Sequence, residues 1–160
     1  MAPDADGSQT VLVVDDDASI RAMLGYVLHD EGYTVREAAD GAEAIAELTD
    51  AAPDCMILDL MMPHVDGLQV LRERRDRGFA PDTRVLVLTA KTDTKDAVWC
   101  WDLGADEYLN KPVDPEQFAR EVRLLLARSS ADLRRRRLVG LADARERDRL
   151  EAAFTPKDMR

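Results

Sequence analysis

The chain has 160 residues, of which 34 % are charged, and a formal net charge of −10. This length allows one folded domain plus an appendage, no apolar stretch approaches the ~20 residues of a membrane-spanning helix, and the negative charge disfavours nucleic acid as a general partner. Since the chain has only two cysteines and no recognisable signal peptide, we expect a cytoplasmic protein without membrane contacts.

The first informative segment is an apolar strand that ends in three carboxylates. Residues 1–9 are expected to be a flexible leader, and residues 10–14 form the strand that precedes Asp15, Asp16 and Asp17. The carboxyl end of a buried parallel strand opens into the crevice where ligands bind. Adjacent carboxylates suit a hard cation, which predicts Mg²⁺, with Mn²⁺ as the alternative. An acidic turn that caps the next helix, with Asp17 or its neighbour as the N-cap, remains the other interpretation.

Strands and helices alternate along the following residues. Pro115 suits the first position of the last of these helices, with Asp114 as its cap. Such alternation implies right-handed crossovers and a parallel sheet. We therefore predict a flavodoxin-like, doubly wound (βα)5 fold with a five-stranded parallel sheet. The expected helices are 18–31, 41–49, 67–77, 94–103 and the one that begins at 115, and the expected further strands are 34–38, 55–58, 85–89 and 107–110.

Three further strands end in polar groups. The third strand ends in Asp59, the fourth in Thr89, and the fifth in Lys111, which a proline follows. These groups should meet Asp16 at one edge of the sheet, because the carboxyl ends of parallel strands lie together. With Mg²⁺ bound by Asp16 and Asp59, Thr89 and Lys111 could hold the oxygens of a phosphoryl group.

The motifs at these strand ends closely resemble the receiver domain of bacterial two-component response regulators. They are VVDDD at 13–17, LDLMMPHVDG at 58–67, LTAK at 88–91 and GADEYLNKP at 104–112. The four strings occur in order and are separated by helix-length segments. The resemblance implies a stand-alone, chemotaxis-type receiver domain over residues 10–128, followed by a helical C-terminal extension over residues 129–160.

The resemblance also implies the chemistry. Asp59 would take a phosphoryl group from a sensor histidine kinase or a phosphotransfer protein and form an acyl phosphate in a Mg²⁺-dependent reaction. Asp16 and Asp59 would bind the metal directly, the backbone carbonyl of Met61 would supply a further oxygen, and Asp15 would act mostly through water. The chain would catalyse only its own phosphorylation and dephosphorylation, so we do not expect an enzyme that acts on other substrates.

Activation and readout are assigned by the same resemblance. Lys111 would pair with Asp59 before phosphorylation and with the phosphate afterwards, and the peptide bond to Pro112 is expected to be cis. The hydroxyl of Thr89 would move to a phosphate oxygen while the ring of Tyr108 turns inward. This change would shift a two-state equilibrium on the face formed by the fourth helix, the fifth strand and the fifth helix. The alternative is that Tyr108 is an ordinary half-buried aromatic residue of a strand.

The fourth helix carries two tryptophans, Trp99 and Trp101, which cannot both face the core. Relatives commonly have a large apolar residue at the position of Trp101, so Trp99 is the candidate interface residue on the output face. Partial burial of Trp99 against the next helix remains the alternative. Ala97 and Glu121 stand where winged-helix relatives carry arginines that support dimerisation. A homodimer through those contacts is therefore in doubt.

The C-terminal extension differs in charge from the receiver. From residue 128 onward ten Lys or Arg stand against six Asp or Glu, a balance of +4 that leaves −14 for residues 1–127. We expect helices over 131–139 and 141–154, with a bend or break at Gly140. The apolar positions hold no heptad, so a long coiled coil is not expected. A run of four arginines is expected to be a solvated helix face, with contact to nucleic acid or an acidic partner as the alternative: Arg134, Arg135, Arg136 and Arg137.

Two classes of output remain open at this point. In the first, the chain relays phosphate or binds a downstream protein partner when it is phosphorylated. In the second, it is a DNA- or RNA-binding regulator that acts through the arginine run or through an effector domain outside this sequence. The acidic receiver and the lack of a recognisable DNA-binding fold favour the first class. A small hydrolase with the same Asp and Mg²⁺ chemistry is a distant third.

Overall fold

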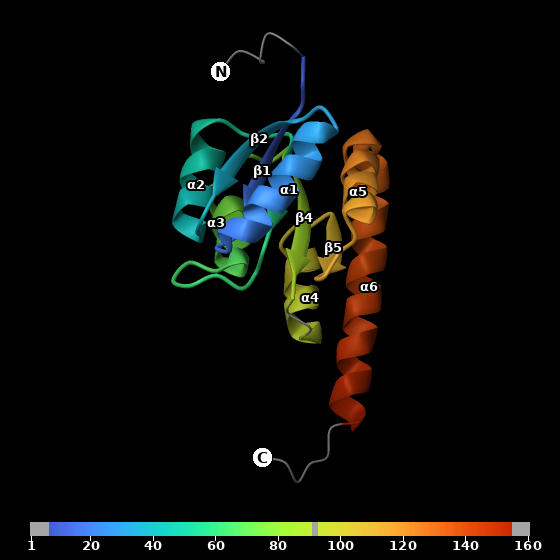
Figure 1. The fold of residues 1–160 in the computed structure, drawn as a ribbon. Coiled ribbons are helices and arrows are strands. Elements are labelled where there is room, and N and C mark those ends of the chain that lie inside the picture. Colours follow the sequence, from blue (N-terminus) through green and yellow to red (C-terminus); the bar gives the residue numbers. More distant parts are fainter. Residues whose placement is uncertain (1–6, 91–92, 155–160) are drawn as a thin grey trace.

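Strands and helices alternate along the chain, as Figure 1 shows for the computed structural model, which describes residues 7–90 and 93–154. Of the expected leader, residues 1–6 lie outside the described residues. The strands are β1 (Thr10–Val14), β2 (Thr34–Ala38), β3 (Cys55–Leu58), β4 (Arg84–Thr89) and β5 (Glu107–Asn110). The helices are α1 (Ala18–Asp30), α2 (Gly41–Asp50), α3 (Gly67–Arg77), α4 (Thr94–Asp102), α5 (Pro115–Ala127) and α6 (Ser130–Phe154).

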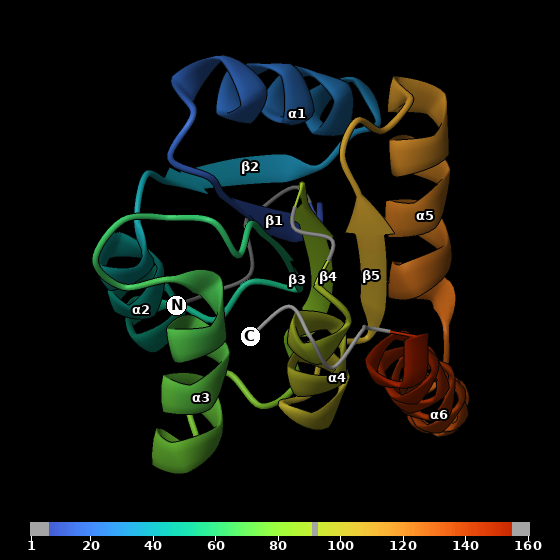
Figure 2. The same ribbon diagram turned by 90° about the horizontal axis from the view of Figure 1, so that it is seen from below.

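The five strands form one parallel sheet in the order β2-β1-β3-β4-β5. Helices α1 and α5 cover one face, and α2, α3 and α4 cover the other (Figure 2). This arrangement confirms the predicted flavodoxin-like, doubly wound fold. It also brings the carboxyl ends of β1, β3, β4 and β5 to the same edge of the sheet, where the polar residues after each strand can meet.

The inner positions of the central strands β1, β3 and β4 are apolar because both faces of the sheet are covered. Val11 and Val13 pack into the cluster under α1 and α5, whereas Leu12 and Val14 pack into the cluster under α2, α3 and α4. Successive side chains of a strand point to opposite faces, so a buried parallel strand needs an apolar residue at every position. The same requirement explains why the carboxylates of Asp15 and Asp59 appear only after β1 and β3 have ended.

Aspartates begin several of the helices. The side chain of Asp17 accepts hydrogen bonds from the N–H groups of Ser19 and Ile20, at 2.9 and 3.2 Å. Asp66 and Gln69 form a reciprocal capping box at the start of α3. Asp114 is the N-cap residue of α5 and Pro115 follows it, as expected, although the Asp114 side chain makes no capping hydrogen bond. The ends of the expected helices differ from the observed ones by at most one residue.

The C-terminal extension contains one continuous helix, α6, which passes through Gly140 without a break. The expected division into two helices is therefore wrong. A Cβ atom on Gly140 would lie 2.5 Å from Cε2 of Trp101, so the glycine lets α6 approach α4 closely instead of ending a helix. Helix α6 lies alongside α4 and extends beyond it (Figure 1). Among the described residues, no helix combines the length and apolar character needed to cross a membrane.

Candidate functional site

Two aspartates lie at the edge of the sheet where the central strands end. Asp15 follows β1 and Asp59 follows β3, and the side chains of both are nearly inaccessible to solvent. The chain at Asp59 is tied to β1 by a hydrogen bond from its N–H to the carbonyl of Val14 at 3.0 Å. The sheet register therefore determines how close the two carboxylates come to each other.

Asp16 joins these two carboxylates. One oxygen of each of Asp15, Asp16 and Asp59 lies within 4.8 Å of the others, with Asp16 exposed to solvent and the other two buried. Three carboxylate oxygens at one place, one of them open to solvent, suit a hard cation that keeps several waters, as Mg²⁺ does. Asp17 is not part of this cluster, because its side chain caps α1. The capping interpretation is therefore confirmed for Asp17, and the cluster of the other aspartates could hold a metal ion.

Lys111 connects the two buried carboxylates. Its Nζ lies 2.6 Å from Oδ2 of Asp15 and 3.1 Å from Oδ2 of Asp59. The peptide bond from Lys111 to Pro112 is cis, as expected. Burial by itself lowers the pKa of Lys111, but the hydrogen bonds and charges of Asp15 and Asp59 outweigh burial and raise it. The ammonium therefore stays protonated and is shared between the two acids.

The backbone of the loop after Asp59 is tightly packed. The N–H of Met61 donates a hydrogen bond to Oδ1 of Asp59 at 3.1 Å. The role of the Met61 carbonyl as a metal ligand stays a prediction. A Cβ atom on Gly67 would lie 2.5 Å from the backbone oxygen of Asp59, and one on Gly41 would lie 2.2 Å from that of Val65. Glycine at both positions is needed for this close backbone approach. Sequence reasoning treated Gly67 only as part of a motif and missed this role.

Thr89 and Tyr108 lie on the strands next to the cluster. Thr89 is fully buried at the end of β4, where its carbonyl accepts a hydrogen bond from the N–H of Lys111 at 2.9 Å. Tyr108 is half-buried on β5. Burial, and secondarily the charges of Cys100 and Asp96, raise the pKa of Tyr108 to about 12, so the phenol is neutral at ordinary pH.

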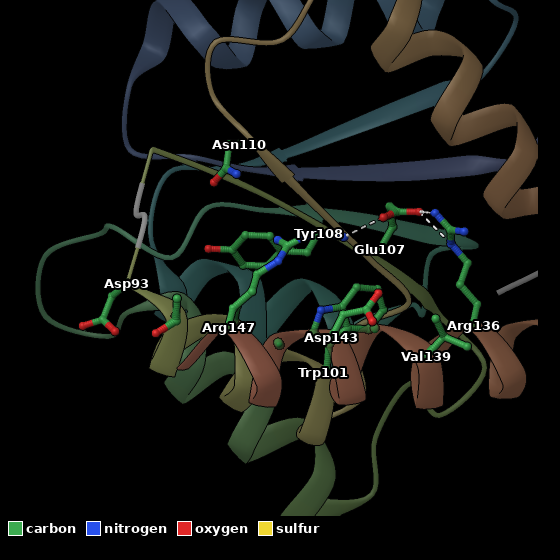
Figure 3. Close-up of a pocket in the computed structure, with 13 residues that line it drawn as sticks. Asp93, Trp101, Glu107, Tyr108, Asn110, Arg136, Val139, Asp143 and Arg147 are labelled. Atoms are coloured by element: carbon green, nitrogen blue, oxygen red, sulfur yellow. Dashed lines mark hydrogen bonds and ion pairs between the residues drawn. The ribbon is translucent and has the colours of Figure 1, made fainter. Parts of the chain in front are cut away.

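Tyr108 faces a cavity between β5, α4 and α6. The cavity has a volume of about 320 Å³, and the side chains of Trp101, Asp143 and Arg147 also line it (Figure 3). Sequence reasoning did not foresee this cavity, because it exists only where α6 crosses β5. It leaves space beside the Tyr108 ring at the position assigned to a conformational switch.

The two tryptophans of α4 face different neighbours. Trp99 is 49 % exposed, and the guanidinium carbon of Arg72 on α3 lies 5.9 Å from the centroid of its ring. Trp101 is 8 % exposed and packs against Gly140 of α6. The tryptophan on the α6 side is thus Trp101, and Trp99 lies on the α3 side of the helix. A role for Trp99 in an interface remains a prediction.

The arginine run is divided between solvent and the receiver. Arg134 is exposed, and Arg135 pairs with the neighbouring Asp132. Nε of Arg136 donates to Oε2 of Glu107 at 2.8 Å, and Nη2 of Arg137 lies 2.5 Å from Oδ1 of Asp106. The expectation of a uniformly solvated face is therefore wrong for Arg136 and Arg137, because two acids on another element pair with them.

Comparison with known proteins agrees with this geometry. The family model described as the response regulator receiver domain matches residues 11–123. The chain belongs to this family. Over 122 residues it is 43 % identical to the response regulator MprA of Mycobacterium sp. (strain KMS), an alignment that covers 76 % of this chain and 52 % of that protein. Over 121 residues it is 41 % identical to the DNA-binding response regulator MtrA of Mycolicibacterium paratuberculosis, with the same coverage.

Solved receiver structures show the same fold. The chemotaxis protein CheY4 of Vibrio cholerae superimposes with a TM-score of 0.69 at 35 % identity, over 74 % of this receiver-family chain and 98 % of that chain. By contrast, the chain spans about half the length of the curated relatives that it matches. The shared part is the receiver domain of a two-component system, and its acidic cluster suits phosphorylation and Mg²⁺ binding.

Proposed function

We propose that this chain is a phosphoacceptor that takes a phosphoryl group from a sensor histidine kinase or a phosphotransfer protein onto Asp59. The observation that carries the proposal is the arrangement of Asp15, Asp16 and Asp59 within 4.8 Å of one another, with Lys111 bonded to the two buried members. Membership of the receiver family of two-component systems supports a kinase as the donor.

The three carboxylates and the backbone carbonyl of Met61 would hold Mg²⁺. The bound ion would supply charge neutralisation where a carboxylate meets the oxygens of a phosphoryl group. The fit rests on the donor set itself, which consists of clustered oxygens with one solvent-exposed member, Asp16. Because one or two carboxylates plus waters are the usual ligands of Mg²⁺, Asp15 can act through water while Asp16 and Asp59 bind directly.

The chain's own residues perform the transfer. A lone pair of the Asp59 carboxylate forms the new O–P bond while the P–N bond of the donor phosphohistidine breaks and its electron pair returns to the imidazole. The N–H of Met61 and the ammonium of Lys111 hold the Asp59 oxygens in position at 3.1 Å each. Lys111 and the Thr89 hydroxyl then bind oxygens of the acyl phosphate. The chain thereby catalyses only its own phosphorylation and dephosphorylation.

Readout would follow from the same groups. When Lys111 and Thr89 turn to the phosphate, the ring of Tyr108 moves inward, and the surface that α4, β5 and α5 form changes shape. Thr89 and Lys111 are joined by a backbone hydrogen bond of 2.9 Å, so a movement of one is passed to the other strand. The changed surface would signal to a downstream protein or return the phosphate to a relay.

The test is incorporation of a phosphoryl group with acetyl phosphate and Mg²⁺ as reagents. We expect wild type to gain one hydroxylamine-labile phosphoryl group by intact mass, and Asp59→Asn to gain none. Asp40→Asn is the matched control, because Asp40 only caps α2, and this variant should be labelled like wild type. Labelling of Asp59→Asn to the wild-type level would show that another residue is the acceptor.

A second candidate is a DNA-binding regulator. It is favoured by the similarity to MtrA, a DNA-binding response regulator, about half of whose length this chain matches. The arginine run contributes less to it than the sequence suggested, since Arg136 and Arg137 already pair with Glu107 and Asp106. Retention of the chain on double-stranded DNA, with a steep salt dependence that Arg134→Gln with Arg135→Gln removes, would favour this candidate.

A further inference from the structure

Helix α6 contacts the receiver through one stripe of its surface. Leu133 and Ala144 are its buried residues, and Gly140 lies between them on the same side. Residues three and four positions apart share a face of a helix, so these positions form a continuous stripe. Two of its members have almost no side chain, which allows close approach but contributes little apolar burial. Ion pairs and hydrogen bonds of α6 accompany this stripe.

Two ion pairs hold the N-terminal half of α6. Arg136 pairs with Glu107, and Arg137 pairs with Asp106, whose carboxylates are nearly buried. The Asp106 carboxylate also accepts a hydrogen bond from the N–H of Val85 at 2.9 Å. The two acids adjoin Tyr108 on the chain, so α6 is attached directly to the strand that carries the assigned switch residue.

The C-terminal half of α6 is held by the first residue of α4. The hydroxyl of Thr94 lies 2.9 Å from Oδ1 of Asp148 and 2.8 Å from Oε2 of Glu151. Thr94 is five positions after Thr89 in the sequence. Thr94 thus opens the helix that follows β4, the strand that ends in Thr89.

We propose that one surface of the receiver is a docking surface for a helix with small residues and arginines. This surface, the α4–β5 surface, is formed by Thr94, Trp101, Asp106 and Glu107. Helix α6 of the same chain occupies it, and phosphorylation weakens the binding of α6. The inference rests on the proposed phosphorylation of Asp59. It extends that proposal by naming the segment that covers the output surface and the kind of helix that can replace it.

The cavity beside Tyr108 explains why the two events are linked. Its volume of about 320 Å³ is roughly ten times the ~30 Å³ that one water occupies in the liquid, so the ring has room to change position. Arg147 and Asp143 of α6 line the cavity together with Tyr108 (Figure 3). Because the Tyr108 ring and α6 line the same cavity, an inward turn of the ring would change the surface that α6 faces. The docked position of α6 therefore belongs to the unphosphorylated state, in which Lys111 pairs with Asp15 and Asp59.

Such coupling is reciprocal by thermodynamic necessity. If a phosphoryl group at Asp59 loosens α6, then loosening α6 by mutation must favour the phosphorylated form by the same factor. Gly140→Leu places a side chain where Trp101 lies and should undock α6. Leucine also has a higher helix propensity than glycine, so undocking could not be attributed to a weaker helix.

The experiment uses the full chain with Mg²⁺ and beryllofluoride, a stable analogue of the phosphoryl group, and measures two quantities separately. Titration gives the affinity for beryllofluoride, and hydrogen–deuterium exchange gives the protection of residues 130–154. We expect beryllofluoride to speed exchange in α6 about fivefold or more, and Gly140→Leu to bind beryllofluoride tighter by a similar factor. Ala142→Leu, on the exposed side of α6, should match wild type in both.

The outcomes separate the two proposals. If beryllofluoride binds while exchange in α6 and the affinity of Gly140→Leu stay at their original values, phosphorylation and α6 docking are independent and the inference is overturned. If beryllofluoride does not bind wild type at all, the proposed function fails together with the coupling. A labelled peptide of residues 129–154 should bind Gly140→Leu and not Ala142→Leu, and its failure to bind either protein would show that the α4–β5 surface does not accept such a helix.

Discussion

The sheet of the receiver and helix α6 are held by different forces. Residues 11–14 of β1 and all of β3 are apolar and inaccessible to solvent, so hydrophobic burial stabilises them. Helix α6 buries only Leu133 and Ala144 and depends on ion pairs and close approach at Gly140. The difference teaches that apolar burial stabilises the sheet, whereas α6 is held mainly by polar contacts, and the proposed release of α6 rests on this difference.

The largest effect expected from this comparison is at Phe118, which is fully buried between α5 and the sheet. Phe118→Ala should lower the free energy of unfolding by about 3 to 5 kcal/mol, because it removes apolar contacts and leaves a cavity. Urea denaturation followed by circular dichroism measures this. Phe154→Ala is the matched control on α6: Phe154 is 82 % exposed, so the cost should stay below about 0.5 kcal/mol. Similar losses for both variants would contradict the division into two regions.

Asp106 tests the junction between the two regions. Asp106→Ala should destabilise the protein by about 3 kcal/mol, because it leaves the Val85 N–H without its acceptor and Arg137 without its partner. The loss should appear both in urea denaturation and as faster hydrogen exchange in α6. Asp132→Ala removes an exposed pair with Arg135 and an exposed hydrogen bond from the hydroxyl of Ser129, and it should change neither measurement by a comparable amount.

Gly67 tests how tightly the phosphorylation site is packed. Gly67→Ala should cost about 1 to 3 kcal/mol and weaken beryllofluoride binding, because the added methyl group collides with the backbone at Asp59. Gly25→Ala in α1 is the control. A Cβ atom there has its nearest neighbour at 3.6 Å, in Val35, so alanine should stabilise by up to about 1 kcal/mol through helix propensity. Unchanged beryllofluoride binding in Gly67→Ala would mean that the loop has room to relax.

The smallest expected effect is at Thr94. Thr94→Val removes the hydroxyl that bonds Asp148 and Glu151, and it should speed hydrogen exchange near the C-terminal end of α6 while global stability falls by only about 0.5 to 1.5 kcal/mol. Thr49→Val provides the comparison, because that hydroxyl bonds only carbonyls of its own helix. If exchange in α6 is the same in both variants, Thr94 does not hold the helix.

The receiver fold could be predicted from the sequence because its signals are local. Runs such as Val11 to Val14 are apolar at every position, and an aspartate cap or a glycine stop marks where several helices begin or end. The meeting of Asp15, Asp16 and Asp59 also followed, since parallel strands bring their carboxyl ends to one edge. The roles of the individual groups in phosphorylation remain predictions.

The position of α6 could not be predicted in the same way. Its contact stripe has one large apolar residue, Leu133, beside Gly140 and Ala144, so a search for apolar periodicity finds no face that should be buried. From the sequence alone, Gly140 indicates a bend or break in a helix. The structure shows instead that the glycine allows close contact with Trp101. The adjacent acids at 106 and 107 and the adjacent arginines at 136 and 137 are complementary, but the sequence does not show that they meet.

The sequence by itself determined the alternating strands and helices, the acidic edge of the sheet and the family, because these depend on periodicity and on the order of residues along the chain. Only the tertiary structure decided where α6 lies, which arginines face solvent and which tryptophan α6 covers. The physical reason is that ion pairs and close contacts between distant elements depend on geometry in space. Such contacts produce no periodic pattern in the sequence.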